Sequence, residues 1–152
     1  MIPRLSSQLQ DEISEEALRC WPEEACGFLL GPSPTEVTEV RPAKNASRQP
    51  TAHFEIDPRE ILALDTHLRV SEQSLIGFFH SHPFGPPSPS TEDQRHAARW
   101  PQTLWVILAL QPSELGPRVS SLTKWWSTGE EPPLVLCSGR SCLPVASSHS
   151  KV

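Results

Sequence analysis

The sequence predicts an α/β (α+β) fold, in which a mixed, mostly antiparallel β-sheet is flanked by about three helices. Two observations lead to this prediction. Capping residues mark the starts of a few helices, and apolar runs of strand length lie between and after them. A chain of 152 residues is long enough to form one domain with its own core. Because strands outnumber helices and are interspersed with them, a single sheet covered by helices fits this order best.

Three helices are expected from their capping patterns. The first covers about residues 7–20, with Ser7 opening a capping box and an apolar stripe following it. The second begins after Asp57, an N-cap residue that is followed by proline at the first helical position. The third begins at Ser90 and carries Asp93 in its first turn.

Apolar runs bounded by turn residues predict the strands. The run at 74–82 is almost continuously apolar, which is typical of a strand buried on both faces. The 17 prolines and seven glycines fall mainly between such runs and therefore mark loops. The expected strands are residues 27–31, 36–43, 53–56, 74–82, 104–111, 118–126 and 133–137.

The composition argues against several classes of protein. A net charge of -5 does not favour nucleic acid or an anionic membrane surface as a partner. No apolar run approaches the roughly 20 residues that span a bilayer, and the acidic N-terminal segment does not resemble a signal peptide. We therefore expect a cytoplasmic protein, with one domain over residues 1–137 and a polar, flexible tail over residues 138–152. Cys137 and Cys142 could pair if oxidised, but two reduced thiols are the favoured interpretation.

The stretch HSHPFGPPSPSTED, residues 80–93, carries candidate metal ligands. On a strand, residues two apart point to the same side, so His80 and His82 present their imidazoles together. Asp93 is a candidate third ligand, because a stiff proline-rich loop would return it to the end of the strand. Three such ligands leave the fourth position of a tetrahedral zinc ion for water, as in catalytic zinc sites.

Each half of this pattern also has an ordinary structural interpretation. Ser90 and Asp93 form a common capping arrangement, and a His-x-His pair on a strand is more often incidental than ligating. His96 lies on the same helical face as Asp93 and is an alternative ligand, although a surface position is the simpler expectation. The combination of both halves favours a metal site.

The same residues resemble a known family. His80-Ser81-His82, seven residues, Ser90, two residues and Asp93 reproduce the H-[ST]-H-x7-S-x2-D signature of the JAMM (MPN+, Mov34/JAB) zinc metallopeptidases. The segment PEEACGFLLG, residues 22–31, is similar to the family's P-x-E-x-C-G segment, and FEIDP before a helix is similar to its compact, stand-alone prokaryotic members. The resemblance extends from about residue 22 to residue 110 and implies an MPN/cytidine-deaminase-like fold.

The resemblance also implies a role for each matching residue. His80, His82 and Asp93 would bind one Zn²⁺ per chain. Glu24 would hold the zinc-bound water and act as general base, and Ser90 would donate a hydrogen bond to the oxyanion.

Two further assignments depend on position. Glu24 is preferred to Glu23 because its offset from Cys26 matches the family pattern. Phe84 and Gly85 follow the histidines and are expected to contact the substrate at the lip of the zinc site.

The function implied is that of a zinc-dependent, deubiquitinase-like peptidase or isopeptidase. Such an enzyme uses metal-activated water to cleave after the C-terminal Gly-Gly of a ubiquitin-like or sulfur-carrier protein, which would be the partner of this chain. The short connection between residues 53 and 80 favours the compact prokaryotic form and, within it, sulfur-carrier processing. Two alternatives remain: an inactive MPN-type binding scaffold, which Glu24 argues against, and a zinc hydrolase of a small non-protein amide.

Overall fold

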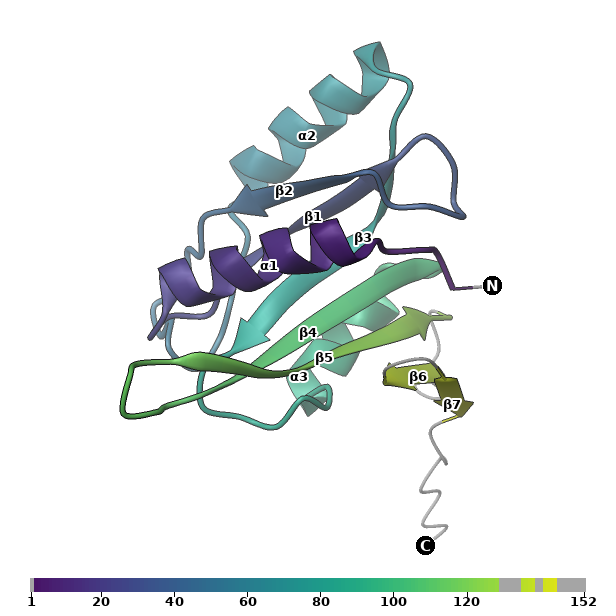
Figure 1. The fold of residues 1–152 in the computed structure, drawn as a ribbon. Coiled ribbons are helices and arrows are strands. Elements are labelled where there is room, and N and C mark those ends of the chain that lie inside the picture. Colours follow the sequence, from purple (N-terminus) through teal and green to yellow (C-terminus); the bar gives the residue numbers. More distant parts are fainter. Residues whose placement is uncertain (1, 129–134, 139–140, 145–152) are drawn as a thin grey trace, which may run out of the picture.

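The computed structural model describes residues 2–128, 135–138 and 141–144 (Figure 1). The helices in this part of the chain are α1 (Ser7–Cys20), α2 (Pro58–Val70) and α3 (Thr91–Ala98). The strands are β1 (Cys26–Gly31), β2 (Glu39–Ala43), β3 (Ser74–His82), β4 (Thr103–Gln111), β5 (Arg118–Ser127), β6 (Val135–Ser138) and β7 (Ser141–Pro144). Apart from β7 and the last residue of β6, the predicted tail lies outside the described residues.

The strands form one mixed sheet in the order β2-β1-β3-β4-β5-β6-β7. Every neighbouring pair is antiparallel except β3 and β4, which are parallel. The predicted fold class, mixed and mostly antiparallel, is confirmed. A parallel pair needs a crossover connection, and here α3 and the loops around it provide it. This crossover places the start of α3 near the carboxyl end of β3.

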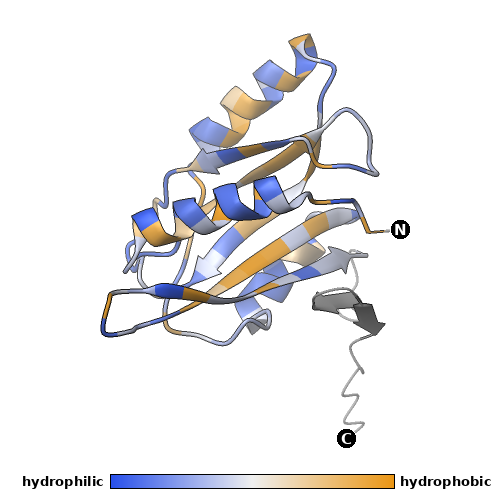
Figure 2. Ribbon diagram, in the orientation of Figure 1, coloured by the Kyte–Doolittle hydropathy of each residue, from blue (hydrophilic) through white to orange (hydrophobic). Residues whose placement is uncertain are grey.

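The helices cover both faces of the sheet. Helix α1 lies across one face, in front of the strands in Figure 1, whereas α2 and α3 pack on the other face. Figure 2 shows how hydrophobic residues concentrate along the central strand β4, which is buried over all but its last residue. Because β1, β3 and β4 are covered on both faces, their sequences are almost continuously apolar.

Helix α1 has the predicted extent, but its cap lies one residue earlier than expected. The N-cap is Ser6, whose hydroxyl accepts from the N–H of Leu9 at 3.3 Å. Ser7, the predicted cap, is the first helical residue. The reason is that the N–H of Gln10 already donates to the Ser6 carbonyl and is not free for the Ser7 hydroxyl.

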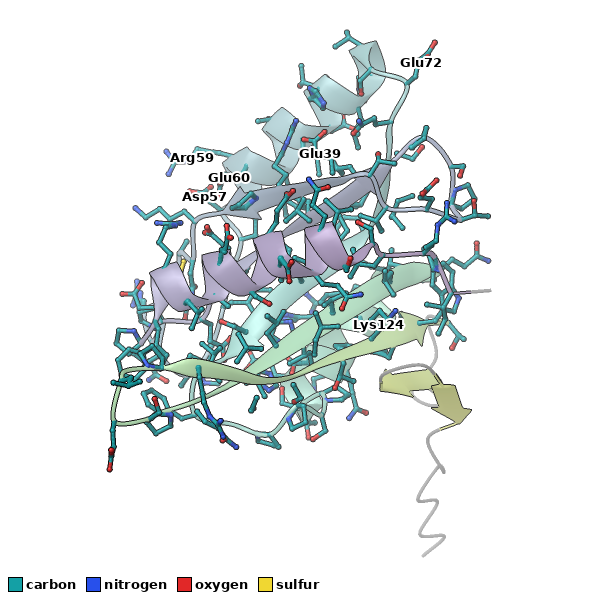
Figure 3. All side chains as sticks on the ribbon, viewed as in Figure 1. Glu39, Asp57, Arg59, Glu60, Glu72 and Lys124 are labelled. Atoms are coloured by element: carbon teal, nitrogen blue, oxygen red, sulfur yellow. The ribbon has the colours of Figure 1, made fainter. Side chains whose placement is uncertain are left out.

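Helix α2 begins at the predicted place. The Asp57 carboxylate accepts from the backbone N–H of Arg59 at 2.8 Å, and Pro58 occupies the first helical position. Figure 3 shows Asp57, Arg59 and Glu60 grouped at this end of the helix. On the inner side, Leu64 is buried against the sheet.

Two predicted strands differ from the structure. Residues 53–56 form no strand and make only an isolated bridge between Ile56 and Asn45, so that prediction is wrong. Their alternating pattern has another origin: Phe54 points into the core that contains α2 and α3, while His53 and Glu55 face solvent. The strand expected at 36–43 begins only at residue 39, because Glu36 bridges to Arg4 instead of joining the sheet.

In the part of the chain that the structure describes, no helix is long and apolar enough to cross a bilayer.

The packing of α1 gives a stability prediction. Ile13 is fully buried between α1 and the sheet. Ile13→Ala should lower the free energy of unfolding by about 2–5 kcal/mol, because lost apolar contact and a residual cavity add together. Denaturant unfolding measures the change. Glu12→Ala, an exposed neighbour on the same helix, should stay within about 0.5 kcal/mol of the wild type; equal losses in the two variants would contradict this packing.

Candidate metal centre

Strand β3 delivers two histidines to one place. His80 and His82 lie at its carboxyl end and point to the face of the sheet that α3 covers; His80 is fully buried and His82 is 9% exposed. The pairing of β3 with β1 on one side and β4 on the other holds this strand end in place. The predicted juxtaposition of the two imidazoles is therefore present.

Helix α3 brings Asp93 to the same place through a reciprocal capping box. The Ser90 hydroxyl accepts from the N–H of Asp93 at 3.1 Å, and Asp93 Oδ2 accepts from the N–H of Ser90 at 2.8 Å. This pair of bonds fixes the first turn of the helix and turns the Asp93 carboxylate inward, where the residue is only 5% exposed.

The three side chains converge closely. His80 Nε2 lies 3.1 Å from His82 Nε2 and 3.2 Å from Asp93 Oδ1, and His82 Nε2 lies 3.1 Å from Asp93 Oδ2. In the described part of the chain, this is the group of residues whose donor atoms could together hold a metal ion. His96, the alternative ligand, instead packs edge-on against Phe54.

The hydrogen bonds around His82 determine which ring nitrogen faces the others. His82 Nδ1 lies 2.6 Å from the carbonyl oxygen of Pro86, which can only accept, so Nδ1 carries a proton. In the neutral ring, Nε2 then presents a lone pair toward His80 Nε2 and Asp93 Oδ2. Lone pairs at this separation repel unless a hydrogen on one of the ring nitrogens or a metal ion lies between them.

The spacing suits a metal ion. Donor atoms bound at about 2.0–2.2 Å to a tetrahedral zinc ion lie about 3.3–3.6 Å apart, close to the separations here. The distances place His80 Nε2 against the other donors, whereas His80 Nδ1 is buried without a hydrogen-bond partner among the described residues. His82 Nδ1 donates to the Pro86 carbonyl. Metal-ligating histidines usually make such a hydrogen bond with the nitrogen that does not bind the metal, and it fixes the orientation of the ring. The residues present therefore fit a divalent metal.

The electrostatics of the three groups follow from burial and mutual contact. Burial lowers the pKa of His80. For His82, burial also lowers the pKa, but hydrogen bonds to Asp93 and the Pro86 carbonyl outweigh it and leave the pKa raised. Burial opposes ionisation of Asp93, yet hydrogen bonds with both histidines hold the pKa of its carboxyl below the usual range. Asp93 is thus an anion beside two imidazoles.

Glu24 lies beside this group, in the connection between α1 and β1. It is 7% exposed, and burial, opposed by His82, raises its pKa to about 7. Glu23, the alternative, is exposed. A carboxyl group with a pKa near neutrality can both take and return a proton, which is the property that a general base requires.

A pocket of about 550 Å³ opens next to these residues, and Glu24, His82 and Asp93 lie in its wall. The predicted contact residues Phe84 and Gly85 also line it. Phe84 is 62% exposed, and its ring lies 5.7 Å from that of Trp21. A Cβ atom at Gly85 would meet His82 only at an ordinary 3.5 Å, so the local packing does not require glycine there.

Sequence reasoning missed several residues around the site. Phe54 stacks on the His80 ring at 4.6 Å, and the exposed His53 pairs with Glu92 across the pocket at 2.6 Å. Neither contact has a local signal, because each joins the 45–56 segment to a distant element. A signal did exist for Ser81, the middle residue of the His-Ser-His triplet.

Ser81 connects the metal-site strand to the residue after Glu24. Its hydroxyl accepts from the N–H of Ala25 at 2.8 Å, and its own N–H donates to the Ala25 carbonyl at 3.0 Å. Ser81 is 1% exposed, so these bonds are shielded from water. A side chain on the face opposite to the histidines thus ties β3 to the segment that carries Glu24.

Fold and site together define an α/β domain with a candidate divalent-metal centre beside a buried carboxyl group. Residues 6–127 match the family described as prokaryotic homologs of the JAB domain. The chain belongs to this family.

Three curated relatives show the range of proteins to which the chain is similar. It is 36% identical over 87 residues to a desampylase of Haloferax volcanii, an alignment covering 57% of this chain and 62% of the relative. It is 35% identical over 92 residues to a probable TtuB-protein conjugate cleaving protease of Thermus thermophilus, covering 60% of each. It is 28% identical over 106 residues to a CysO-cysteine peptidase of Mycobacterium tuberculosis, covering 69% and 71%. The chain thus spans about three fifths of the length of the first two.

Solved structures share the fold. Protein DSY2949 from Desulfitobacterium hafniense superimposes with a TM-score of 0.64 at 28% identity, over 88% of this chain and 87% of that one. A structure described as a JAMM metalloprotease-like zinc site in the proteasome and signalosome superimposes with a TM-score of 0.52 at 20% identity, over 87% and 94%. At that identity, the second likeness shows the fold alone.

The Ser81 contact gives a second stability prediction. Ser81→Ala leaves the buried N–H of Ala25 without its acceptor, which should cost about 1–3 kcal/mol in the free energy of unfolding. Ser81→Thr keeps the hydroxyl and should recover most of this loss. Denaturant titration of the three proteins measures both changes. A Ser81→Ala variant as stable as the wild type would show that water replaces the hydroxyl and that the contact contributes little.

Proposed function

We propose that this chain is a zinc-dependent peptidase or isopeptidase of the JAMM type. The single observation that carries the proposal is the convergence of His80 Nε2, His82 Nε2 and the Asp93 carboxylate beside the buried Glu24, at the wall of an open pocket. We assign the activity to one domain of residues 1–137, outside the segment 138–152. The cytoplasm is the proposed compartment.

His80, His82 and Asp93 would hold one zinc ion per chain. When bound, zinc supplies a Lewis acid that makes water nucleophilic near neutral pH. The protein contributes a fixed set of ligands: the paired strand orients the histidines, and the capping box orients Asp93. Asp93 Oδ2 accepts from the Ser90 N–H, which limits rotation of the carboxylate and favours a single ligating geometry.

Glu24 would act as the general base. Its carboxyl group is buried beside His82 and Asp93, and within the described residues it makes no hydrogen bond that would occupy its oxygens. It can therefore take a proton from the attacking water and deliver it to the departing amine. An amine leaves an amide readily only when it is protonated, so the same carboxyl group serves both halves of the reaction.

Ser90 would stabilise the oxyanion that develops on the attacked carbonyl. As helix cap, its oxygen accepts from the N–H of Asp93 through a lone pair. Its hydroxyl hydrogen is not used in that bond and can be donated into the pocket that Ser90 lines. Capping and oxyanion stabilisation therefore use different parts of one hydroxyl and do not compete.

The proposed substrate is a ubiquitin-like or sulfur-carrier protein that ends in Gly-Gly. The relatives support this class, since they are named a desampylase, a TtuB-protein conjugate cleaving protease and a CysO-cysteine peptidase. The pocket supports an extended peptide, because Phe84 and the proline-rich loop form one of its walls. Two glycines could pass beside this wall where larger side chains would collide.

The experiment combines metal analysis with cleavage. The wild type should contain about one zinc per chain and should cleave a ubiquitin-like protein extended after Gly-Gly, as mass spectrometry detects. Glu24→Gln should retain zinc but lose at least about 100-fold in kcat, since it removes the proton acceptor and keeps the shape. His80→Ala should lose both zinc and activity.

His96→Ala is the matched control, because His96 lines the same pocket and lies outside the metal group. It should keep zinc. Zinc-loaded protein that leaves every Gly-Gly-tailed substrate intact would contradict the peptidase assignment and favour the binding scaffold. Chelator-sensitive cleavage of small amides alone would favour the small-amide hydrolase.

Ser90 has its own test. Ser90→Ala should lower kcat by about 100-fold or more, as expected for the loss of one oxyanion donor, and should lower stability by about 1 kcal/mol through loss of the cap. Ser90→Asp keeps a capping acceptor but has no proton to donate. It should restore stability without restoring kcat; recovery of both by Ser90→Asp would limit Ser90 to capping.

A further inference from the structure

The 45–56 segment, which joins β2 to α2, forms one wall of the pocket and is organised by a single side chain. Asn45 Nδ2 donates to the carbonyl oxygens of Glu24, Pro50 and His53 at 3.1, 3.2 and 2.9 Å. Asn45 Oδ1 accepts from the N–H groups of Ser47 and Glu55 at 3.0 and 3.2 Å. The side chain thus joins both ends of the segment to its middle.

The orientation of this amide is unambiguous. Its nitrogen faces three carbonyl oxygens, which only accept, and its oxygen faces two N–H groups, which only donate. The two amide hydrogens serve three acceptors and the two oxygen lone pairs serve two donors, so the full hydrogen-bonding capacity of asparagine is used. Aspartate has no hydrogens to donate, and alanine can replace none of the bonds.

The segment holds the backbone of Glu24 at both polar groups. The Glu24 N–H donates to the Pro50 carbonyl at 2.7 Å, and the Glu24 carbonyl accepts from Asn45 Nδ2. The Glu24 carboxylate itself makes no hydrogen bond within the described residues. Its position therefore depends on the backbone that carries it. On the far side, Ser81 fixes the next residue, Ala25.

The same segment contacts a metal ligand. Phe54 stacks on His80, and Asn45 bonds to the residues on both sides of Phe54, namely His53 and Glu55. One side chain therefore connects the backbone of Glu24 with the residues that flank Phe54, which contacts His80.

We infer that Asn45 is a positioning residue, which holds Glu24 in register with His80, His82 and Asp93. The inference rests on the proposed function, in which Glu24 is the general base. Asn45 touches neither substrate nor metal in this role. A displacement of about 1 Å in a reacting group can cost about 100-fold in rate, so loosening this backbone should act on the chemical step.

The test compares Asn45→Ala with the wild type in zinc content, melting temperature, kcat and KM. We expect kcat to fall about 10- to 100-fold and KM to change less than kcat, because only one of the pocket walls is loosened while the wall at Phe84 is kept. Zinc content should be unchanged, because the three ligands themselves are held by β3 and α3. Ser47→Ala is the matched control: in the part of the chain that the structure describes, the Ser47 hydroxyl accepts from the N–H of Gln49, within the segment, and makes no hydrogen bond to another element. It should keep wild-type kcat.

Three results would overturn the inference: wild-type kcat in Asn45→Ala, an equal fall of kcat in Ser47→Ala, or a parallel loss of zinc. If Asn45→Ala does not fold, Asn45→Asp replaces it, because aspartate keeps the shape and the two acceptor bonds while losing the three donor bonds. The same kinetic criteria apply to it.

A crystal structure of the variant separates this inference from the proposed function. If the wild type cleaves no Gly-Gly-tailed protein, the proposed function fails. The effect of Asn45 on the position of Glu24 can still be measured in the crystal. A Glu24 carboxylate that is displaced or disordered in Asn45→Ala, beside unmoved histidines, would support the positioning role. An unmoved Glu24 would refute it.

Discussion

The site depends on the unfavourable approach of three electron-rich and largely buried groups beside an open pocket. Two imidazole nitrogens and a carboxylate lie 3.1–3.2 Å apart, with the histidines nine-tenths or more buried. The surrounding fold makes this approach possible. A parallel pairing of β3 with β4 forces the chain through a crossover, and the crossover helix begins where β3 ends. The capping box of α3 then fixes the first turn of the helix, and one of its two hydrogen bonds, from the N–H of Ser90 to Asp93 Oδ2, holds the carboxylate.

A second constraint aligns the carboxyl group of Glu24 with this centre. Glu24 lies in a loop, but its backbone N–H and carbonyl are both hydrogen-bonded to the 45–56 segment. On the other side, the backbone of the next residue, Ala25, is hydrogen-bonded to Ser81. Since Ser81 separates the two histidines in the sequence, strand geometry links the proposed base to the proposed metal ligands directly. Burial then raises the pKa of the carboxyl group to about 7, which gives it the proton affinity its role requires.

Short-range sequence patterns predicted the candidate metal ligands. The His-x-His pair follows from strand periodicity, and Asp93 follows from its place in a helix start, so both could be found from spacing. The contacts of Asn45 and Phe54 could not, because they join the 45–56 segment to Glu24 and His80, far away in the sequence. The predicted strand at 53–56 was wrong for the same reason: the Asn45 side chain, instead of a neighbouring strand, takes up hydrogen bonds of that segment.

The most direct measurement of the central claim is a crystal structure of the zinc-loaded protein with anomalous diffraction recorded at the zinc absorption edge. The account predicts one peak per chain, about 2.0–2.2 Å from His80 Nε2, His82 Nε2 and an oxygen of Asp93, with Glu24 facing the remaining position. A peak at any other group of residues, or three side chains joined by hydrogen bonds with no peak between them, would contradict it. In that case a proton, and not a metal ion, would balance the converging lone pairs.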